Sequence, residues 1–204
     1  MIELKSVGRT FGNRTLFENI NDTFKAGEMV GISGKSGSGK STLLNIIGLI
    51  DREYDGEVII HEGSTKALSK RKKEQLVKEN INYLFQNYAL IDSETVRYNL
   101  EIVLSKKNDL SLHNALEKVG LDASILDTPI YILSGGEQQR VALARCILKE
   151  GHIILADEPT GNLDQENAAV VMNILSNFTK QGKVVIIVSH SDDIISQCDR
   201  ILTL

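Results

Sequence analysis

The sequence has 204 residues, 42% of them hydrophobic and 25% charged, which is typical of a globular chain with a substantial core and excludes general disorder. Lys and Arg total 23 and Asp and Glu total 27, so the net charge of −4 argues against binding nucleic acid through bulk charge. No apolar stretch approaches the roughly 20 residues of a membrane span, and the N-terminus lacks the plan of a secretory signal. We therefore expect a soluble, cytoplasmic protein whose two cysteines are reduced.

The first sixty residues predict a small antiparallel sheet beside the start of a parallel one. Polar and apolar residues alternate at Ile2 to Leu4 and again at Glu57 to Ile60, as in strands with one buried face. The run Met29 to Ile32 is instead continuously apolar, which is typical of parallel strands covered on both faces. An apolar helix is predicted at Thr42 to Ile47.

The segment between that strand and that helix matches the phosphate-binding P-loop pattern G-x-x-x-x-G-K-[ST] at every position. Its glycines let backbone amides converge on a phosphate, and the helix adds its positive end. Lys40 can reach the β- and γ-phosphates, and the Ser41 hydroxyl can bind Mg²⁺. A Gly/Ser loop that matches by accident is the alternative, and the flanking strand and helix argue against it. The predicted ATP-binding residues are Gly34, Lys35, Ser36, Gly37, Ser38, Gly39, Lys40, Ser41 and Thr42.

The segment from 93 to 132 differs from the rest because it predicts helices and loops without a long strand. We interpret it as a short helical insertion in a single domain that spans residues 1–204. The α/β core and the β subdomain are then formed by residues 1–92 and 133–204, and the helical subdomain by residues 93–132.

A second anion site is predicted at Leu133-Ser134-Gly135-Gly136-Glu137-Gln138-Gln139-Arg140, where a helix begins. The Ser134 side chain and the amides of Gly135 and Gly136 can face a phosphate there. The alternative is an N-cap serine with Glu137 three residues later, which is a capping box without chemical significance. Both interpretations can hold, but two adjacent glycines form helices poorly and suit close backbone approach better.

Two further apolar runs, Ile153 to Ala156 and Val184 to Val188, each end in polar residues. Ligands bind at the carboxyl ends of parallel strands, so these residues are candidates for chemistry. We expect Asp157 to hold Mg²⁺ through water and Glu158 to orient or deprotonate an attacking water. His190 can donate a hydrogen bond to the γ-phosphate. A charged turn after a strand is the alternative for the two acids, and a strand-capping role is the alternative for His190.

The end of the chain completes an alternation of strands and helices. Gln165 to Lys180 carries its apolar residues on one helical stripe, and Arg200 to Thr203 predicts a last strand. The predicted fold class is α/β: a P-loop NTPase core with a parallel sheet, a small N-terminal antiparallel β subdomain and a short helical insertion.

Leu133 to Arg140 resembles the signature motif of ATP-binding-cassette (ABC) ATPases, and the other motifs come in that family's order along nearly the whole chain. The resemblance implies three further site residues. Phe11 is similar to the aromatic residue that stacks on adenine, although ordinary packing explains a lone Phe equally well. Gln86 is similar to the glutamine that touches Mg²⁺ and water and senses the permease. Asp164, in Gly161-Asn162-Leu163-Asp164, is similar to the acid of the loop that crosses the dimer seam, for which a plain turn is the alternative.

The resemblance also implies partners. Two copies would pack head to tail, so that Ser134 of one faces the γ-phosphate held by Lys40 of the other, and the dimer would lie on the cytoplasmic face of the membrane beneath a separate integral permease. The motifs resemble the branch of macrolide exporters and lipoprotein-release ATPases, and the Phe85 to Leu90 stretch resembles ATPases of bacteriocin or peptide export. We expect an export ATPase that uses ATP and Mg²⁺ and binds no nucleic acid.

Other functions remain open from the residues alone. The same dimer can act on a membrane partner as a regulatory or mechanical ATPase without moving a substrate. ABC ATPases that act on DNA or ribosomes carry tandem cassettes or a long coiled-coil insertion, and neither is present in the sequence. A P-loop kinase or GTPase would leave Leu133 to Arg140 unexplained.

Overall fold

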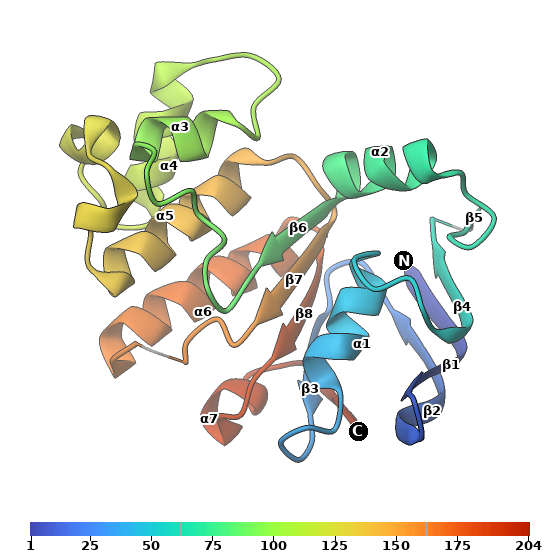
Figure 1. Ribbon diagram of the computed structural model, residues 1–204. Helices are drawn as coiled ribbons and strands as arrows, with labels where there is room; N and C mark the ends of the chain where they lie inside the picture. Colours follow the sequence, from blue (N-terminus) through green and yellow to red (C-terminus); the bar gives the residue numbers. More distant parts are fainter. Residues whose placement is uncertain (62, 162) are drawn as a thin grey trace.

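The computed structural model describes residues 1–61, 63–161 and 163–204, so Asn162 of the predicted seam loop lies outside the described residues. Two sheets form the fold (Figure 1). One is antiparallel with strand order β2-β1-β4-β5, and the other has the order β6-β7-β8-β3-β9. All four pairings in the second sheet are parallel. The predicted α/β class, with a parallel core and a small antiparallel sheet, is confirmed.

The antiparallel sheet is built on a long hairpin of β1 (Ile2–Phe11) and β2 (Arg14–Phe24). The strands β4 (Asp55–Ile60) and β5 (Gly63–Ser64) extend it on the other side of β1. Ile2 pairs with Ile60 and Leu4 with Val58, and all four side chains are buried. The alternating residues therefore form one buried face, as the period of two predicts.

The parallel sheet holds the continuous apolar runs. Its strands are β3 (Met29–Ser33), β6 (Ile81–Leu84), β7 (Ile153–Asp157), β8 (Val184–Val188) and β9 (Arg200–Thr203). All five residues of β8 are buried, because both faces of the sheet are covered. Alternate residues of β7 belong to different clusters: Ile153 and Leu155 pack with α1 (Lys40–Ile47) and the antiparallel sheet, and Ile154 and Ala156 with α5 (Gly135–Leu148) and α6 (Gln165–Lys180).

The remaining helices lie around this core. They are α2 (Lys70–Asn80) before β6, α7 (Asp192–Ile195) after β8, and a group formed by α3 (Val96–Glu101), α4 (Asp109–Lys118) and the 3₁₀ helices η1 (Ala123–Asp127) and η2 (Ile130–Ile132). In Figure 1 this group stands at the upper left, beside the α5 end of the core. Within the described ranges, no helix has the length and apolar character needed to cross a bilayer.

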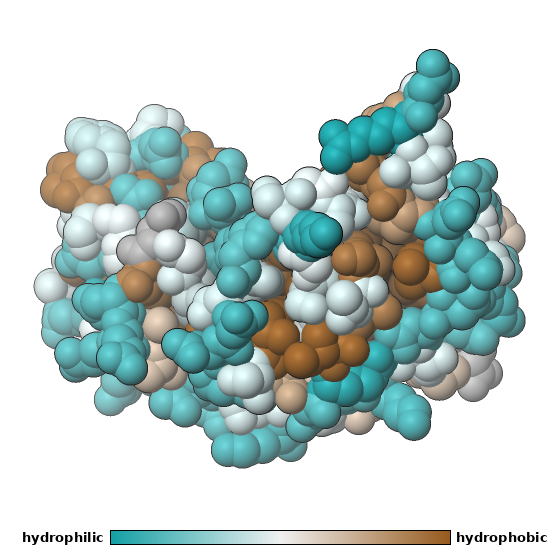
Figure 2. Space-filling model, turned by 90° about the horizontal axis from the view of Figure 1, so that it is seen from below, coloured by the Kyte–Doolittle hydropathy of each residue, from teal (hydrophilic) through white to brown (hydrophobic). Residues whose placement is uncertain are grey.

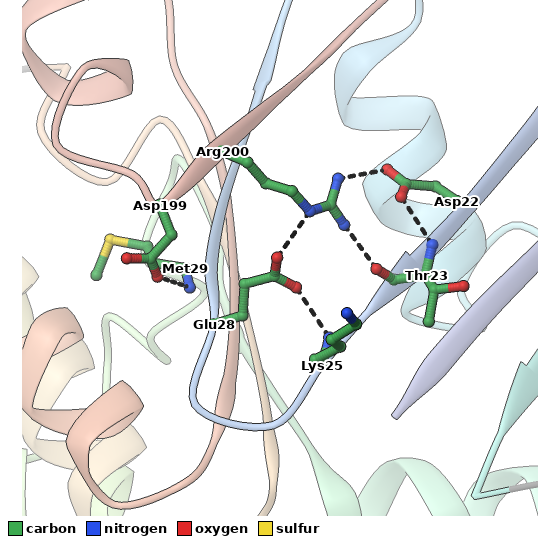
Figure 3. Close-up of polar contacts among 7 residues, drawn as sticks. All are labelled: Asp22, Thr23, Lys25, Glu28, Met29, Asp199 and Arg200. Carbon is green, nitrogen blue, oxygen red and sulfur yellow. Dashed lines mark hydrogen bonds and ion pairs between the residues drawn. The ribbon is translucent and has the colours of Figure 1, made fainter.

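An arginine cluster holds the edge strand β9 in place (Figure 3). Arg200 donates from Nε to Glu28 Oε1 and from Nη1 to Asp22 Oδ2, both at 2.8 Å, and from Nη2 to the Thr23 carbonyl at 2.7 Å. The strand pairs with β3 up to Thr203, and directly after it the Leu204 amide donates to the Ser33 carbonyl oxygen at 3.0 Å. Arg200 therefore fixes the start of β9, at the opposite end of the strand from Thr203, which pairs with Ser33 just before the P-loop.

Candidate functional site

The P-loop joins β3 to α1 at the lower edge of the view in Figure 1. Two of its glycines are required by their backbone conformation and by the atoms packed around them. Gly34 has φ +150°, and a Cβ there would lie 2.6 Å from the Leu204 carbonyl oxygen. Gly39 has φ +99°, and a Cβ there would lie 2.8 Å from the Phe17 ring. A side chain at either position would collide with its neighbours and strain the backbone.

Lys40, the first residue of α1, folds back over this loop. The residue is only 5% exposed, and its Nζ donates to the carbonyl oxygens of Gly34 at 2.9 Å and Lys35 at 3.1 Å. An ammonium has three donors, so one is left for a ligand. The buried Ser38 Oγ makes no hydrogen bond to any described residue. The loop thus holds a cation and an orphaned hydroxyl, the donor set that a phosphate needs, and ATP phosphates fit it.

Ser41 and Asp157 meet at the carboxyl end of β7. The Ser41 hydroxyl donates to Asp157 Oδ1 at 2.9 Å. Burial raises the pKa of Asp157, while the Ser41 hydrogen bond and the charge of Lys40 act to lower it. A hydroxyl and a carboxylate next to a phosphate loop are suitable oxygen ligands for Mg²⁺, which takes its remaining ligands from substrate phosphates and water.

Glu158 follows Asp157 in a backbone conformation unusual for its residue type. Its φ is +50°, and its amide donates to the Val188 carbonyl oxygen at 2.9 Å. Its Oε2 accepts from the His190 amide at 3.3 Å and from the Ser189 hydroxyl at 3.4 Å. Its Oε1 is buried without a hydrogen-bond partner among the described residues and lies 3.5 Å from His190 Nε2. One carboxylate oxygen is therefore available to a water.

A cavity of about 1150 Å³ brings together side chains from distant parts of the sequence. Its lining includes Ser41, Gln86, Glu158 and His190, all of them predicted site residues. Figure 2 views the molecule from below, the side on which the P-loop lies, and shows hydrophilic residues around hydrophobic patches near the centre. The four predicted residues are close enough to act on one substrate.

Gln86 reaches this cavity from an irregular segment after β6. Tyr88 and Ala89 both have positive φ, at +63° and +47°. Their carbonyl oxygens each accept a hydrogen bond of 2.7 Å from the guanidinium of Arg145 on α5, and burial lowers the pKa of Arg145. Arg145 thus fixes the segment that carries Gln86. Sequence reasoning missed it, because an arginine within an amphipathic helix gives no signal of such a contact.

The predicted signature residues lie elsewhere. Ser134 caps α5 and forms a capping box: the Glu137 amide donates to Ser134 Oγ at 3.4 Å, and the Ser134 amide donates to Glu137 Oε2 at 2.8 Å. Ser134 Oγ also donates to Glu137 Oε2 at 2.7 Å. The capping interpretation is therefore confirmed, and the hydrogen bonds that the Ser134 hydroxyl and amide donate to the carboxylate lower the pKa of Glu137. A Cβ on Gly135 would meet no atom within 4 Å, and one on Gly136 only Leu163 at 4.0 Å. Among the described residues, the signature residues do not line the cavity that contains Glu158.

Phe11 and Asp164 also lie outside the lining of that cavity. Phe11 ends β1 and is 50% exposed, so it is not a core residue. Asp164 caps α6, with its Oδ1 accepting from the Asn167 amide at 2.8 Å. The hydrogen bonds from Asn167 lower the pKa of this exposed carboxyl. Both residues remain predictions with respect to adenine and the dimer seam.

The fold and the phosphate loop define a P-loop ATPase of the cassette class, and the comparisons agree. The family profile described as "ABC transporter" matches residues 17–161. The structure aligns over the whole chain with "Dimeric Structure of MJ0796, a Bacterial ABC Transporter Cassette", at a TM-score of 0.92, 34% identity and 94% of that chain. The same cassette in a post-hydrolysis state bound to ADP and Pi gives a TM-score of 0.91 at 33% identity. This chain belongs to the ABC transporter family and is an ATP-binding ATPase domain.

Curated relatives point to the exporter branch. The chain is 39% identical, over its full length, to the "Macrolide export ATP-binding/permease protein MacB" of Escherichia coli, and 37% identical to that of Pasteurella multocida. It is 36% identical over 99% of its length to the "Pyoverdine export ATP-binding/permease protein PvdT" of Pseudomonas aeruginosa. The chain spans about a third of the length of these relatives. The predicted resemblance to macrolide exporters is confirmed.

Proposed function

We propose that this ATPase works as a head-to-tail homodimer that closes on two ATP molecules and drives export through a membrane permease. One observation supports the dimer most directly: close contacts within the chain explain Gly34 and Gly39 of the P-loop, but no such contact among the described residues explains Gly135 or Gly136 of the signature. Gly135 faces open space, and the helix start beside it is outside the cavity of the same chain. A second copy would bring that helix start to the phosphates, where small residues permit close approach.

The arrangement of side chains assigns a role to each in hydrolysis. Lys40 and the P-loop amides bind the phosphates. Ser41 and Asp157 would hold Mg²⁺, which when bound neutralises charge on the phosphate oxygens. Glu158 Oε1 orients the attacking water and accepts its proton, because it is buried and free of other hydrogen bonds. His190 and Gln86 line the same cavity and position the γ-phosphate and the water.

The permease contact is supported by a groove of about 340 Å³ that is lined in part by Phe85 and Ala89, which flank Gln86 in the sequence. Ile50, Phe85, Ile102 and Arg145 are among the residues that line it. Ile50 and Ile102 are half exposed, although both are large and apolar. The named relatives are ATP-binding/permease proteins of about three times this length, so a permease segment is the occupant that fits the groove. The dimer would then lie on the cytoplasmic face of the membrane.

The test of this proposal is the oligomeric state of a hydrolysis-deficient variant. Glu158→Gln should form dimers with ATP and Mg²⁺ and remain monomeric with ADP, as measured by light scattering after gel filtration. Glu117→Gln, the same substitution at an exposed position of α4, is the matched control and should hydrolyse ATP like the parent. Monomers of Glu158→Gln at saturating ATP and Mg²⁺ would contradict the proposal.

Transport and regulation need a second measurement. With the permease in vesicles, a transport ATPase moves cargo in proportion to the ATP that it hydrolyses. A regulatory or mechanical ATPase would hydrolyse ATP in the same vesicles without moving any solute.

A further inference from the structure

An arginine lies over the exposed aromatic ring at the end of β1. The guanidinium carbon of Arg9 is 4.0 Å from the centroid of the Phe11 ring, within the range of a cation–π contact. Arg9 is 9% exposed, whereas Phe11 is 50% exposed. One face of the ring is therefore covered by a buried cation, and a large part of the ring is left open to solvent.

The end of the β1–β2 hairpin lies against the phosphate loop. Phe11 pairs with Arg14, the first residue of β2, and Arg14 Nη2 donates to the Gly37 carbonyl oxygen at 3.2 Å. Three residues further along β2, the Phe17 ring fills the space beside Gly39. The hairpin end that carries Phe11 therefore lies against the loop that takes the triphosphate, because its partner Arg14 contacts that loop.

Two carboxylates that follow the C-terminal end of α1 hold Arg9 in place. Its Nε donates to Asp51 Oδ2 at 3.0 Å and its Nη2 to Glu53 Oε2 at 3.3 Å. Asp51 follows the helix that begins with Lys40, and its side chain is 20% exposed, so this pair is poorly screened by solvent. The helix that presents Lys40 to the phosphates is therefore linked, through Asp51 and Arg9, to the ring of Phe11.

We propose that Arg9 is a positioning residue for the nucleotide base: it fixes the Phe11 ring from behind so that the open face stacks on adenine. This inference rests on the proposed function, since it requires ATP in the P-loop. A ring fixed before binding loses little conformational entropy when the base arrives. Arg9 acts through Phe11 and does not itself touch the nucleotide.

The chain contains a second arginine that pairs with two acids and lies near a phenylalanine ring, but this ring is not exposed to solvent. Arg200 also pairs with two acids, Asp22 and Glu28, and lies 5.3 Å from the centroid of Phe24. Phe24 is fully buried, so no ligand can reach that ring. Substituting Arg200 therefore removes the same kind of interaction away from the nucleotide site, and Arg200→Gln is the control for Arg9→Gln.

The experiment compares binding of ATP and of inorganic tripolyphosphate, which has no base, by calorimetry with Mg²⁺ in the Glu158→Gln background. Arg9→Gln should weaken ATP about three- to fivefold, the size of a cation–π contact at a partly exposed ring. It should leave tripolyphosphate within about twofold, since the phosphate loop is unchanged. Arg200→Gln should leave the ratio of the two affinities unchanged. If Arg9→Gln does not fold, Arg9→Met serves in its place, because methionine keeps an apolar side chain beside the ring and removes the cation.

A double-mutant cycle separates positioning from general stability. Phe11→Leu should weaken ATP but not tripolyphosphate, and Arg9→Gln added to it should have no further effect on ATP. The inference is overturned if Arg9→Gln weakens both ligands equally, if its effect persists beside Phe11→Leu, or if Phe11→Leu leaves the ratio unchanged. Failure of the background protein to bind either ligand would instead overturn the proposed function.

Discussion

Replacing Gly135 with alanine should stabilise the folded monomer and weaken ATP-driven dimerisation. This combination is expected only if the signature contacts a second copy of the chain. Gly135 is the first residue of α5, and a Cβ there meets no atom within 4 Å. Alanine in a helix is more stable than glycine by roughly 0.5–1 kcal/mol, so we expect Gly135→Ala to raise the free energy of unfolding by about 0.5 kcal/mol at this terminal position.

The same substitution should weaken association in the proposed dimer. In the proposed dimer each added methyl group would enter the narrow space between the helix start and the phosphates of the other copy. Overpacking of this kind costs roughly 1–3 kcal/mol, so the ATP-driven association constant should fall about tenfold or more. Gly39→Ala gives the opposite pattern in the monomer: its φ of +99° and the Phe17 ring 2.8 Å from the new Cβ should destabilise the fold by roughly 1–3 kcal/mol.

Chemical denaturation of the free chain and light scattering in the Glu158→Gln background measure the two effects separately. Gly63→Ala is the control for an added methyl group at an unstrained glycine, because its Cβ would have its nearest neighbour at 3.6 Å. The reasoning fails if Gly135→Ala associates and hydrolyses ATP like the parent. It also fails if the substitution destabilises the monomer by more than about 1 kcal/mol, since that would require an intramolecular reason for the glycine.

Three further outcomes are expected. Glu158→Gln should bind ATP like the parent and slow phosphate release by about 10²–10⁴-fold, because it removes the proposed base and leaves the phosphate loop intact; an unchanged rate would exclude Glu158 as the base. Lys40→Ala should weaken ATP binding itself in calorimetry, since the buried ammonium is the cation of the loop, and an unchanged affinity would contradict that role. Burial raises the pKa of Cys198 to about 11, so alkylation of this thiol in the native protein should be roughly a hundredfold slower at pH 8 than for a thiol of the reference pKa of 9.0, and should accelerate with pH up to about 11. Labelling at the rate of an unfolded control would show that Cys198 is not packed as described.

The sequence predicted those parts of the fold and site that depend on local order along the chain. The runs at β3, β7 and β8 are apolar at nearly every position, and each ends at polar residues, so both the strands and their functional ends could be located. The P-loop needed only its own eight residues and the flanking elements. The α6 helix was predicted over Gln165 to Lys180, and the structure gives the same bounds.

The rest depends on contacts between residues far apart in sequence. β6 contains a buried polar residue, Asn82, so its pattern did not predict a strand. The Asn82 side-chain amide donates to the carbonyl oxygens of Cys146 in α5 and of Lys149, the residue that follows this helix. The two hydrogen bonds of Arg145 cross 56 and 57 residues. Arg9 reaches Asp51 across 42 residues, and neither arginine belongs to a motif. Such partners are fixed by the packing of β6, α5 and the hairpin, which local patterns do not specify.

The phosphate-binding part of the site and the part that acts on the water differ in how many of their polar groups are hydrogen-bonded within the chain. At the phosphate end, Lys40 makes two hydrogen bonds to the loop and Ser41 makes one to Asp157, so binding groups are in place before any ligand arrives. At the water end, Glu158 keeps a left-handed backbone, which costs roughly 1–3 kcal/mol. One of its buried carboxylate oxygens has no hydrogen-bond partner in the part of the chain that the structure describes. The Ser134 hydroxyl is occupied by Glu137 until another acceptor replaces it. In the proposed dimer, a monomer built this way would bind ATP by itself and would hydrolyse it quickly only after a second copy brings its Ser134 and signature glycines to the γ-phosphate.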